Sequence, residues 1–209
     1  MTEVSEKRTE DLFGGGVKPA NTREKLIFTA VHLFQERGFH AVGLDFILTE
    51  AQLTKSTFYN HFESRDALAL EAVRLRDKWE MDAFIKAVQD KAGFDPKAML
   101  LAMFDVLDDW FNHPDYKGCI FIAACSEFPS PDNPIKCAAS KHYADAGESI
   151  KKMATAIGIS DAERFAEEWV MLLEGAITYR QVTDDNRAAQ IARRTAAACL
   201  ERYLSERVC

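Results

Sequence analysis

The chain has 209 residues, of which 47% are hydrophobic and 28% are charged, as is typical of a globular protein with a sizeable core. Its formal net charge of −7 argues against nucleic-acid binding by the chain as a whole. There is no apolar run of roughly 18 residues and no signal-peptide pattern, so we expect a cytoplasmic protein without a membrane span. Only 10 Gly and 6 Pro, with few runs of β-branched residues, favour an all-α fold.

The first 17 residues are mostly polar and contain three consecutive glycines at 14–16, so we expect residues 1–17 to form a disordered arm. The first helix is expected to begin after Asn21, because Asn21 and Glu24 have the spacing of a capping box. Gly38 is expected to end it. Its buried face would consist of apolar residues at helical spacing: Leu26, Ile27, Ala30, Leu33 and Phe34.

Two short helices with a tight break between them are predicted in the segment that follows. The first runs from Leu44 to Ala51, and the second begins after Thr54, a good N-cap residue. Leu53 and Phe58 can face the core. The opposite side then carries cationic, hydroxyl and aromatic groups, which suit phosphates and base edges: Lys55, Ser56, Thr57, Tyr59 and His61. The alternative is a pair of ordinary helices, but so many weak helix formers in one short helix need a reason beyond folding.

The segment Thr22–Val73 resembles the DNA-binding region of the TetR (tetracycline repressor) family of transcriptional regulators. The resemblance lies in TREKLIFTAVHLFQERGF, DFILTEA and LTKSTFYNHFESRDAL. It implies a repressor that binds a palindromic operator in double-stranded DNA as a homodimer and is released by a small, largely apolar molecule. The residues implied in DNA binding are Thr22, Lys55, Tyr59, His61 and Arg65 at phosphates, and Ser56 and Thr57 at base edges.

Two residues depart from the family pattern. Gln52 stands in the turn where the family usually has glycine, so it is expected to hold a left-handed conformation at a cost of about 1–2 kcal/mol. Gly43 stands where Thr or Ser is frequent, which removes a hydroxyl that could bind a phosphate. The segment from Lys18 to Asp66 has six basic and six acidic residues, so the negative charge of the chain lies elsewhere.

Beyond this head, Ser64 is placed to cap a long helix that runs to about Lys91 and, at 1.5 Å per residue, spans about 40 Å. Such a helix can connect a DNA-reading head to a separate body. Further helical segments are expected at 96–112, 117–128, 135–157, 162–183 (capped by Ser160) and 186–205. We therefore predict about nine helices. Residues 18–66 would form the helix-turn-helix DNA-binding domain and residues 67–209 the ligand-binding and dimerisation domain.

The last two predicted helices form a hairpin. One alternative is that their apolar faces pack only within the monomer. The resemblance implies instead that they form a four-helix bundle with the same two helices of a second copy. Small residues at Gly175, Ala176 and 196–198 would allow close packing. The apolar residues on these helices are Phe165, Trp169, Leu172, Leu173, Ala176 and Ile177, and then Ile191, Thr195, Ala198, Leu200, Tyr203 and Leu204.

A sensor of this type needs a mostly apolar cavity with a few polar groups among its middle helices. The alternative for each candidate is a place in the ordinary core. The candidate ligand-binding residues are Phe104, Phe111, Phe121, Glu127, His142, Trp169 and Leu173.

The chain has five cysteines and no C-x-x-C pair, which argues against a disulfide framework or a zinc site. Cys119 lies at an expected helix start, where the helix dipole lowers a thiol pKa, so a regulator that senses oxidants or electrophiles through Cys119 is an alternative. A small buried side chain is the competing interpretation.

Catalytic signatures are absent from the sequence: it has no Gly-rich phosphate loop, no H-E-x-x-H and no G-x-S-x-G. We therefore expect no enzyme activity, no cofactor and no metal. An alternative of another class is a helical binding or enzymatic module that does not use its head.

Overall fold

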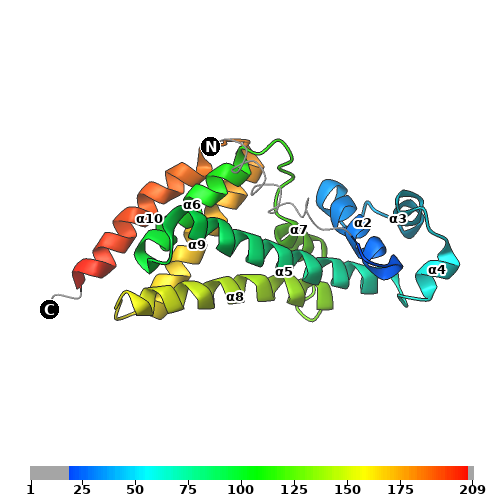
Figure 1. Cartoon of the computed structure of the whole chain (residues 1–209), viewed down its shortest axis with the longest axis horizontal. Coiled ribbons are helices and arrows are strands. Elements are labelled where there is room, and N and C mark those ends of the chain that lie inside the picture. The colour runs from blue at the N-terminus through cyan, green and yellow to red at the C-terminus, as the bar shows by residue number, and fades with distance from the viewer. Residues whose placement is uncertain (1–18, 207–209) are drawn as a thin grey trace. The chain divides into compact units, whose positions relative to one another are not determined.

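The computed structural model describes residues 19–206, so the predicted arm at 1–17 lies outside the described residues. Within this range the regular structure consists of nine α-helices and no strands, which confirms the predicted all-α fold (Figure 1). The helices are α2 (Thr22–Arg37), α3 (Leu44–Ala51), α4 (Lys55–Tyr59), α5 (Arg65–Ala92), α6 (Pro96–Phe111), α7 (Ile120–Glu127), α8 (Pro134–Ala156), α9 (Ala162–Thr183) and α10 (Ala188–Ser205). No helix in this part of the chain is long and apolar enough to cross a membrane.

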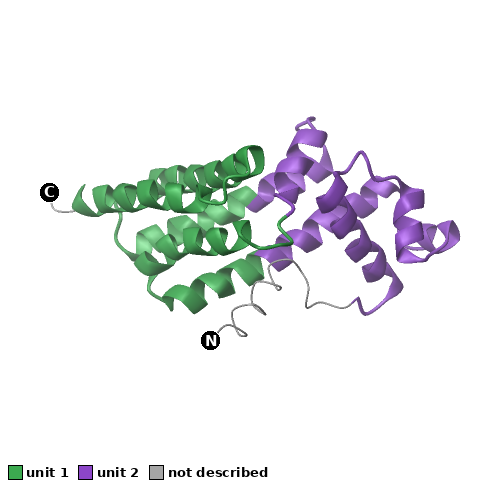
Figure 2. Cartoon of the chain, turned by 90° about the horizontal axis from the view of Figure 1, so that it is seen from above, with its two compact units in different colours: residues 1–13, 81–116, 143–209 green, residues 14–80, 117–142 purple. Residues whose placement is uncertain are grey.

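The described residues form two compact units, which Figure 2 shows in different colours. One unit, here called the head unit, contains residues up to 80 together with 117–142. The other, here called the body unit, contains 81–116 and the chain from 143 onward. Helices α5 and α8 contribute residues to both units, so neither unit is one continuous stretch of sequence.

The head unit begins with the predicted Asn21 cap, but the returning bond of the capping box comes from the N–H of Ala20 and not from that of Asn21. The Asn21 side chain accepts a hydrogen bond from the Glu24 backbone N–H at 2.9 Å, and the Glu24 carboxylate accepts one from the Ala20 N–H at 2.7 Å. Helix α2 then buries its apolar face and ends at Gly38, which has a φ of 81°. Phe39, directly after it, stacks on Phe34 with ring centroids 4.7 Å apart. These contacts fix the direction in which the chain leaves α2.

The tight break between α3 and α4 is made by Gln52 and Thr54. Gln52 has φ 53° and ψ 47°, the left-handed conformation that the sequence predicts. Thr54 has extended backbone, and its side-chain hydroxyl accepts a hydrogen bond from the Thr57 N–H at 3.2 Å, which starts α4. Phe58 is the buried residue of this short helix, and its ring lies 5.7 Å from that of Phe62. Helices α3 and α4 therefore form a helix-turn-helix supported by α2.

In the body unit, α10 packs against α6 and α9. The core contains stacked and edge-on aromatic rings: Trp169 lies 4.9 Å from Phe165 and 5.5 Å from Phe104. The prediction that Ser160 caps α9 is wrong. The cap is Asp161, whose carboxylate accepts a hydrogen bond from the Arg164 N–H at 3.2 Å, because an N-cap directly precedes the first helical residue.

Candidate nucleic-acid interface

Helix α4 presents three of its five side chains to solvent. Lys55, Ser56 and Tyr59 are exposed, and Tyr59 retains 59% of its accessible surface. Phe58 alone is fully buried within the helix, so a single aromatic anchor holds α4 in place. A five-residue helix has too few internal hydrogen bonds to be stable alone, and this anchor with the Thr54 cap supplies the missing stability.

The exposed surface continues past the end of α4 through Asn60 and His61. Asn60 was not among the predicted contacts, although its neighbours on both sides were. Its amide can both donate and accept, as base edges require. Thr57 is half-buried, and its hydroxyl lies 2.9 Å from that of Thr54. Thr22 is half-buried at the first position of α2, where backbone N–H groups point toward solvent or an anion.

The lysine of α4 already has an acidic partner. The Nζ of Lys55 lies 2.8 Å from a carboxylate oxygen of Asp45 on α3, and both side chains are mostly exposed. The hydrogen bond to Asp45 and its charge raise the pKa of Lys55, which keeps the ammonium charged. A DNA phosphate at Lys55 must therefore compete with Asp45.

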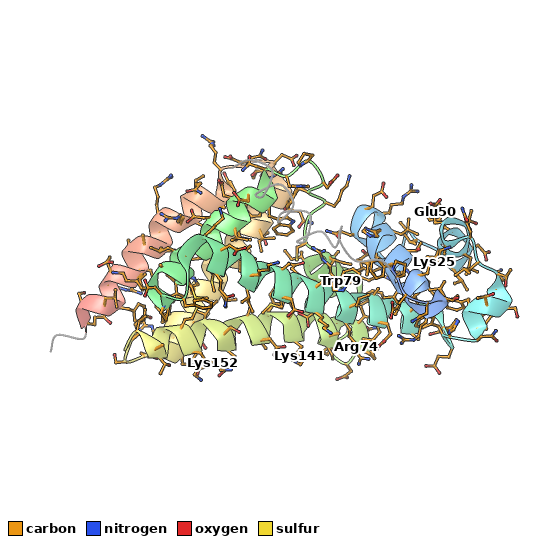
Figure 3. The ribbon with its side chains drawn as sticks, viewed as in Figure 1. Lys25, Glu50, Arg74, Trp79, Lys141 and Lys152 are labelled. Atoms are coloured by element: carbon orange, nitrogen blue, oxygen red, sulfur yellow. The ribbon has the colours of Figure 1, made fainter. Side chains whose placement is uncertain are left out.

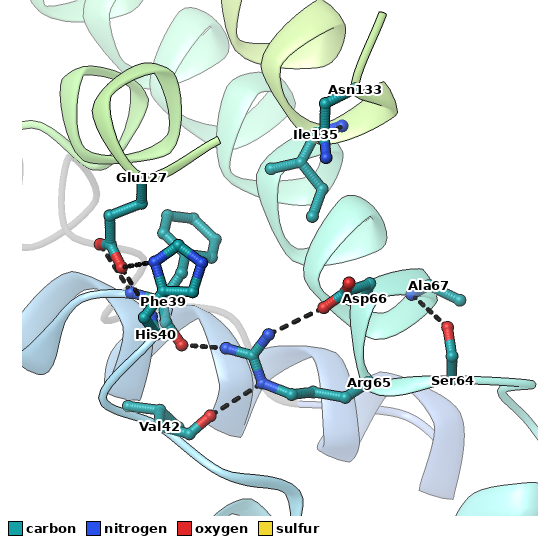
Figure 4. A network of polar contacts seen from close by, with 10 residues as sticks. All are labelled: Phe39, His40, Val42, Ser64, Arg65, Asp66, Ala67, Glu127, Asn133 and Ile135. Carbon is teal, nitrogen blue, oxygen red and sulfur yellow. Dashed lines mark hydrogen bonds and ion pairs between the residues drawn. The ribbon is translucent and has the colours of Figure 1, made fainter. Parts of the chain in front are cut away.

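Arg65, at the start of α5, directs its guanidinium into the head unit (Figure 4). Its Nε donates to the Val42 carbonyl at 2.8 Å, and its Nη2 donates to the Phe39 carbonyl. Its Nη1 donates to Asp66 at 2.8 Å. All three nitrogens thus have acceptors, and two of these are backbone carbonyls in the loop between α2 and α3.

The same loop is held from its other side by Glu127, the last residue of α7 (Figure 4). One carboxylate oxygen accepts the Phe39 N–H at 2.8 Å, and the other accepts the His40 N–H at 2.6 Å. A Cβ on Gly38 would lie 2.8 Å from the same carboxylate. Glu127 is also a predicted ligand-binding residue, and in this structure its carboxylate fixes the entry to the helix-turn-helix.

The predicted ligand-binding residues are divided between the two units. Phe104, Phe111, Trp169 and Leu173 are buried in the body unit. Phe121, Glu127 and His142 belong to the head unit, where the His142 ring stacks on Phe121 with centroids 3.9 Å apart. The Nδ1 of His142 also lies 2.8 Å from a carboxylate oxygen of Asp77 on α5.

Cys119, the candidate sensor, is the N-cap residue of α7 and is 6% exposed. Its side chain makes no capping hydrogen bond. The burial suits a packing role, and sensing stays an untested alternative. Among the described residues, no group of three or more His, Cys, Asp and Glu is arranged to hold a metal ion.

A helix-turn-helix with an exposed polar second helix, followed by a helical body, defines a DNA-binding regulator. The chain matches two family models. Residues 26–72 match "Bacterial regulatory proteins, tetR family", and residues 96–196 match "Tetracyclin repressor-like, C-terminal domain". The chain belongs to the TetR family and is a DNA-binding transcriptional regulator.

Similar proteins cover most of the chain. The HTH-type transcriptional regulator YjdC of Escherichia coli is 22% identical over 178 residues, which are 83% of this chain and 91% of YjdC. A TetR-type transcriptional regulator from Streptomyces avermitilis superposes with a TM-score of 0.78 at 23% identity, covering 88% of this chain and 98% of its own. SCO4454, a TetR-family regulator from Streptomyces coelicolor, has a TM-score of 0.74 at 26% identity, covering 88% and 95%.

Proposed function

We propose that this regulator is a repressor that binds a palindromic operator as a homodimer and is released by a small molecule. The observation that carries the proposal is the exposed face of α4, where hydroxyl, cationic and aromatic groups stand together around one buried anchor. Two such helices, one from each subunit, would enter successive major grooves about 34–36 Å apart. A protein with this task works where the chromosome lies, which agrees with the expected cytoplasmic location.

Lys55, Tyr59 and His61 are proposed to contact phosphates, and Ser56 and Thr57 are proposed to contact base edges. Thr22 would meet a phosphate at the N-terminus of α2. For Arg65 we propose a positioning role in place of a phosphate contact, because its nitrogens already bond Val42, Phe39 and Asp66. Asn60 joins the proposed base contacts because it lies exposed in the same segment.

The homodimer is proposed to form through the outer face of α9 and α10. Most of the apolar residues predicted for this purpose are buried within the body unit, among them Trp169, Leu173, Ala176 and Leu200. Three of the predicted residues, Ile191, Thr195 and Ala198, are exposed on the outer face. The exposed residues of this face have a helical spacing of four, three and four: Met171, Gly175, Thr178 and Val182 on α9, and Ile191, Thr195, Ala198 and Arg202 on α10 (the last residue charged).

Two large apolar side chains on this outer face support that assignment. Met171 is 74% exposed and Val182 is 76% exposed, which is costly unless another surface covers them. A Cβ on Gly175 would meet no heavy atom within 4 Å, so the absence of a side chain there is not required by the monomer. A glycine inside a helix costs about 1 kcal/mol relative to alanine, and a closely packed partner helix would account for it.

The response to an effector is proposed to pass through α7. Glu127 bonds the loop before α3, and α7 belongs to the same compact unit as the helix-turn-helix. An effector that displaces α7 therefore changes the position of the loop and weakens DNA binding. By thermodynamic linkage, DNA must weaken effector binding by the same factor.

The decisive test is selection of bound sequences from random duplex DNA by the wild type and by Tyr59→Ala. As a matched control, Phe94→Ala removes another exposed ring, from the body unit. We expect the wild type and the control to enrich one palindrome and Tyr59→Ala to lose it. A folded, dimeric wild type that enriches nothing after removal of any bound ligand would refute the proposal and favour a module that does not use its head.

A further inference from the structure

One charged side chain of the head unit is almost completely buried. Arg76 on α5 is 1% exposed, in line with Ala72 and Val73 one turn earlier on the same buried face. Arg74, two residues before it, projects into solvent on the same helix and is labelled in Figure 3. Burying a guanidinium costs far more than burying an apolar side chain unless acceptors surround it.

The acceptors around Arg76 do not satisfy its donors. The Nη2 of Arg76 lies 2.9 Å from a carboxylate oxygen of Glu80, one turn further along α5. Neither Nε nor Nη1 has a hydrogen-bond acceptor in the described part of the chain. A guanidinium carries five N–H donors, and buried polar groups in folded proteins nearly always form hydrogen bonds. We therefore expect a bound group to supply a hydrogen-bond acceptor to Nε or Nη1.

The neighbouring ionisable groups do not provide that partner. The carboxylate of Asp77 is engaged by His142, which in turn stacks on Phe121. His32 on α2 has an exposed side chain, and partial desolvation and then the charge of Arg76 lower its pKa. A histidine side chain is either neutral or positive, so His32 cannot supply the negative charge that the guanidinium lacks.

We propose that Arg76 is the anchor for the anionic group of the effector, and that this effector is a carboxylic acid with an apolar body. This inference rests on the proposed function. The effector expected from the sequence is small and largely apolar, and the inference adds that it carries one negative charge. A carboxylate can accept from Nη1 while Nη2 stays with Glu80. A single negative charge fits better than a phosphate dianion, because Glu80 already neutralises part of the guanidinium charge and a buried dianion is costlier to desolvate.

The position of Arg76 also explains how such an effector acts on DNA binding. Arg76 lies on α5, and its charge acts on His32 of α2, the helix that supports the helix-turn-helix. An anion bound at Arg76 would offset the guanidinium charge that acts on His32. The effector is thereby coupled to the DNA-reading helices without contacting them.

The test uses acetate and benzoate as probes, with acetamide and benzamide as neutral counterparts, at constant ionic strength and up to tens of millimolar. The proteins are the wild type, Arg76→Met, Arg76→Met with Glu80→Gln, and Arg74→Met as the matched control. The readouts are the melting temperature, the NMR titration of His32 and the affinity for the selected operator. The double variant removes the carboxylate that Arg76→Met would leave unpaired, so it separates lost binding from lost folding.

We expect the two carboxylates, but not the amides, to raise the melting temperature of the wild type and of Arg74→Met. They should raise the pKa of His32 and weaken operator binding about tenfold, within the usual range for coupled sites. The Arg76 variants should show a raised His32 pKa without any probe and no response to the carboxylates. Equal action of acids and amides, or no response of the wild type to any carboxylate, would overturn the proposal. If only neutral molecules release the protein from the operator, the proposed regulator function stands and the proposed anion site at Arg76 is refuted.

Discussion

The Glu127 carboxylate accepts the backbone N–H of His40 at 2.6 Å and lies 3.0 Å from the Nδ1 of the same residue. The same carboxylate also accepts the Phe39 N–H, so one side chain of α7 contacts three nitrogens of the loop that leads into α3: two backbone N–H groups and the Nδ1 of His40. Arg65 holds the carbonyls of that loop, so the entry to the helix-turn-helix is fixed through both its N–H and its C=O groups.

Replacing Glu127 by alanine should loosen this loop. The partly buried N–H of Phe39 and the exposed N–H of His40 lose their acceptor, which costs about 1–3 kcal/mol of folding stability. The helix-turn-helix becomes less well oriented, so we expect operator affinity to fall about tenfold. Urea denaturation and operator titration measure both effects. Glu148→Ala, at an exposed position of α8, is the control, and similar losses in both variants would contradict a specific role for Glu127.

Gly38→Ala should reduce the folding stability more than Gly93→Ala does. Both glycines have positive φ, 81° and 66°, but only a Cβ on Gly38 would meet a neighbour, at 2.8 Å from Glu127. The backbone of Gly38, with ψ 166°, is nearly exclusive to glycine and costs other residues about 1–3 kcal/mol, whereas Gly93→Ala should cost about 1 kcal/mol.

A double-mutant cycle tests whether Glu127 causes part of this penalty. Because alanine at 127 removes the clashing atoms, Gly38→Ala with Glu127→Ala should lose less stability than the sum of the two single changes. Strict additivity in thermal or urea unfolding would show that the backbone conformation alone decides the cost.

Asp45→Asn should increase the affinity for DNA. It releases Lys55 from an exposed ion pair of 2.8 Å and removes a negative charge from α3. Exposed pairs contribute about 0.2–1 kcal/mol, so we expect roughly a two- to fivefold gain, largest at low salt. Glu50→Gln removes the same charge from an exposed position of α3, so the difference between the two variants isolates the freed lysine. Equal gains would mean that Lys55 does not contact a phosphate.

Gly175→Arg should convert a dimer into a monomer. Gly175 is exposed, a Cβ added there meets no heavy atom within 4 Å, and arginine is a better helix former than glycine, so the fold itself should tolerate the change. Ala144→Arg, at an exposed position of α8, supplies the control. Light scattering after size-exclusion chromatography gives the mass directly. A Gly175→Arg protein that remains dimeric would place the subunit contact elsewhere.

Acid should weaken the junction between α2 and α5 through Glu71. The hydrogen bond from Arg23, reinforced by Arg74, holds the pKa of Glu71 below its ordinary value of 4.5. The folded protein therefore binds fewer protons at this site than the unfolded chain. The resulting stability, about 0.5–1 kcal/mol for a partly exposed pair, is present above pH 4.5 and is lost as the pH falls through the folded-state pKa.

Unfolding free energies measured between pH 3 and 6 test this point. Glu71→Gln should flatten the dependence below about pH 4.5, because glutamine does not titrate. Glu63→Gln provides a control at an exposed carboxylate that forms no ion pair within the described residues. An unchanged slope in Glu71→Gln would assign the acid sensitivity to other carboxylates.

The parts of the fold that the sequence predicts correctly are those decided by residues close together in the chain. The Asn21 cap, the left-handed Gln52 and the Thr54 cap each depend on contacts within four residues. Helix α3 was predicted from Leu44 to Ala51 and has those bounds, because its apolar spacing and its stop signal agree.

The site residues that the sequence could not assign have distant partners. Glu127 bonds His40, which is 87 residues away, so nothing near Glu127 in the sequence indicates its role. Arg65 looked like a phosphate contact because a basic residue beside a recognition helix suggests one, and the acceptors that occupy it become known only from the fold. The burial of Arg76 had no signal either, because arginine in an amphipathic helix normally faces solvent.

The discontinuity of the head unit limits how its DNA specificity can be transplanted. A chimaera cut after the helix-turn-helix would carry α2, α3 and α4 but leave behind α7, and with it the acceptor for Phe39 and His40. The ring of Phe39 would also lose its edge-on contact with Phe128 at 5.5 Å. Exchanging operators between this regulator and a relative therefore requires the transfer of two separate stretches of sequence, the second of which includes Glu127 and Phe128.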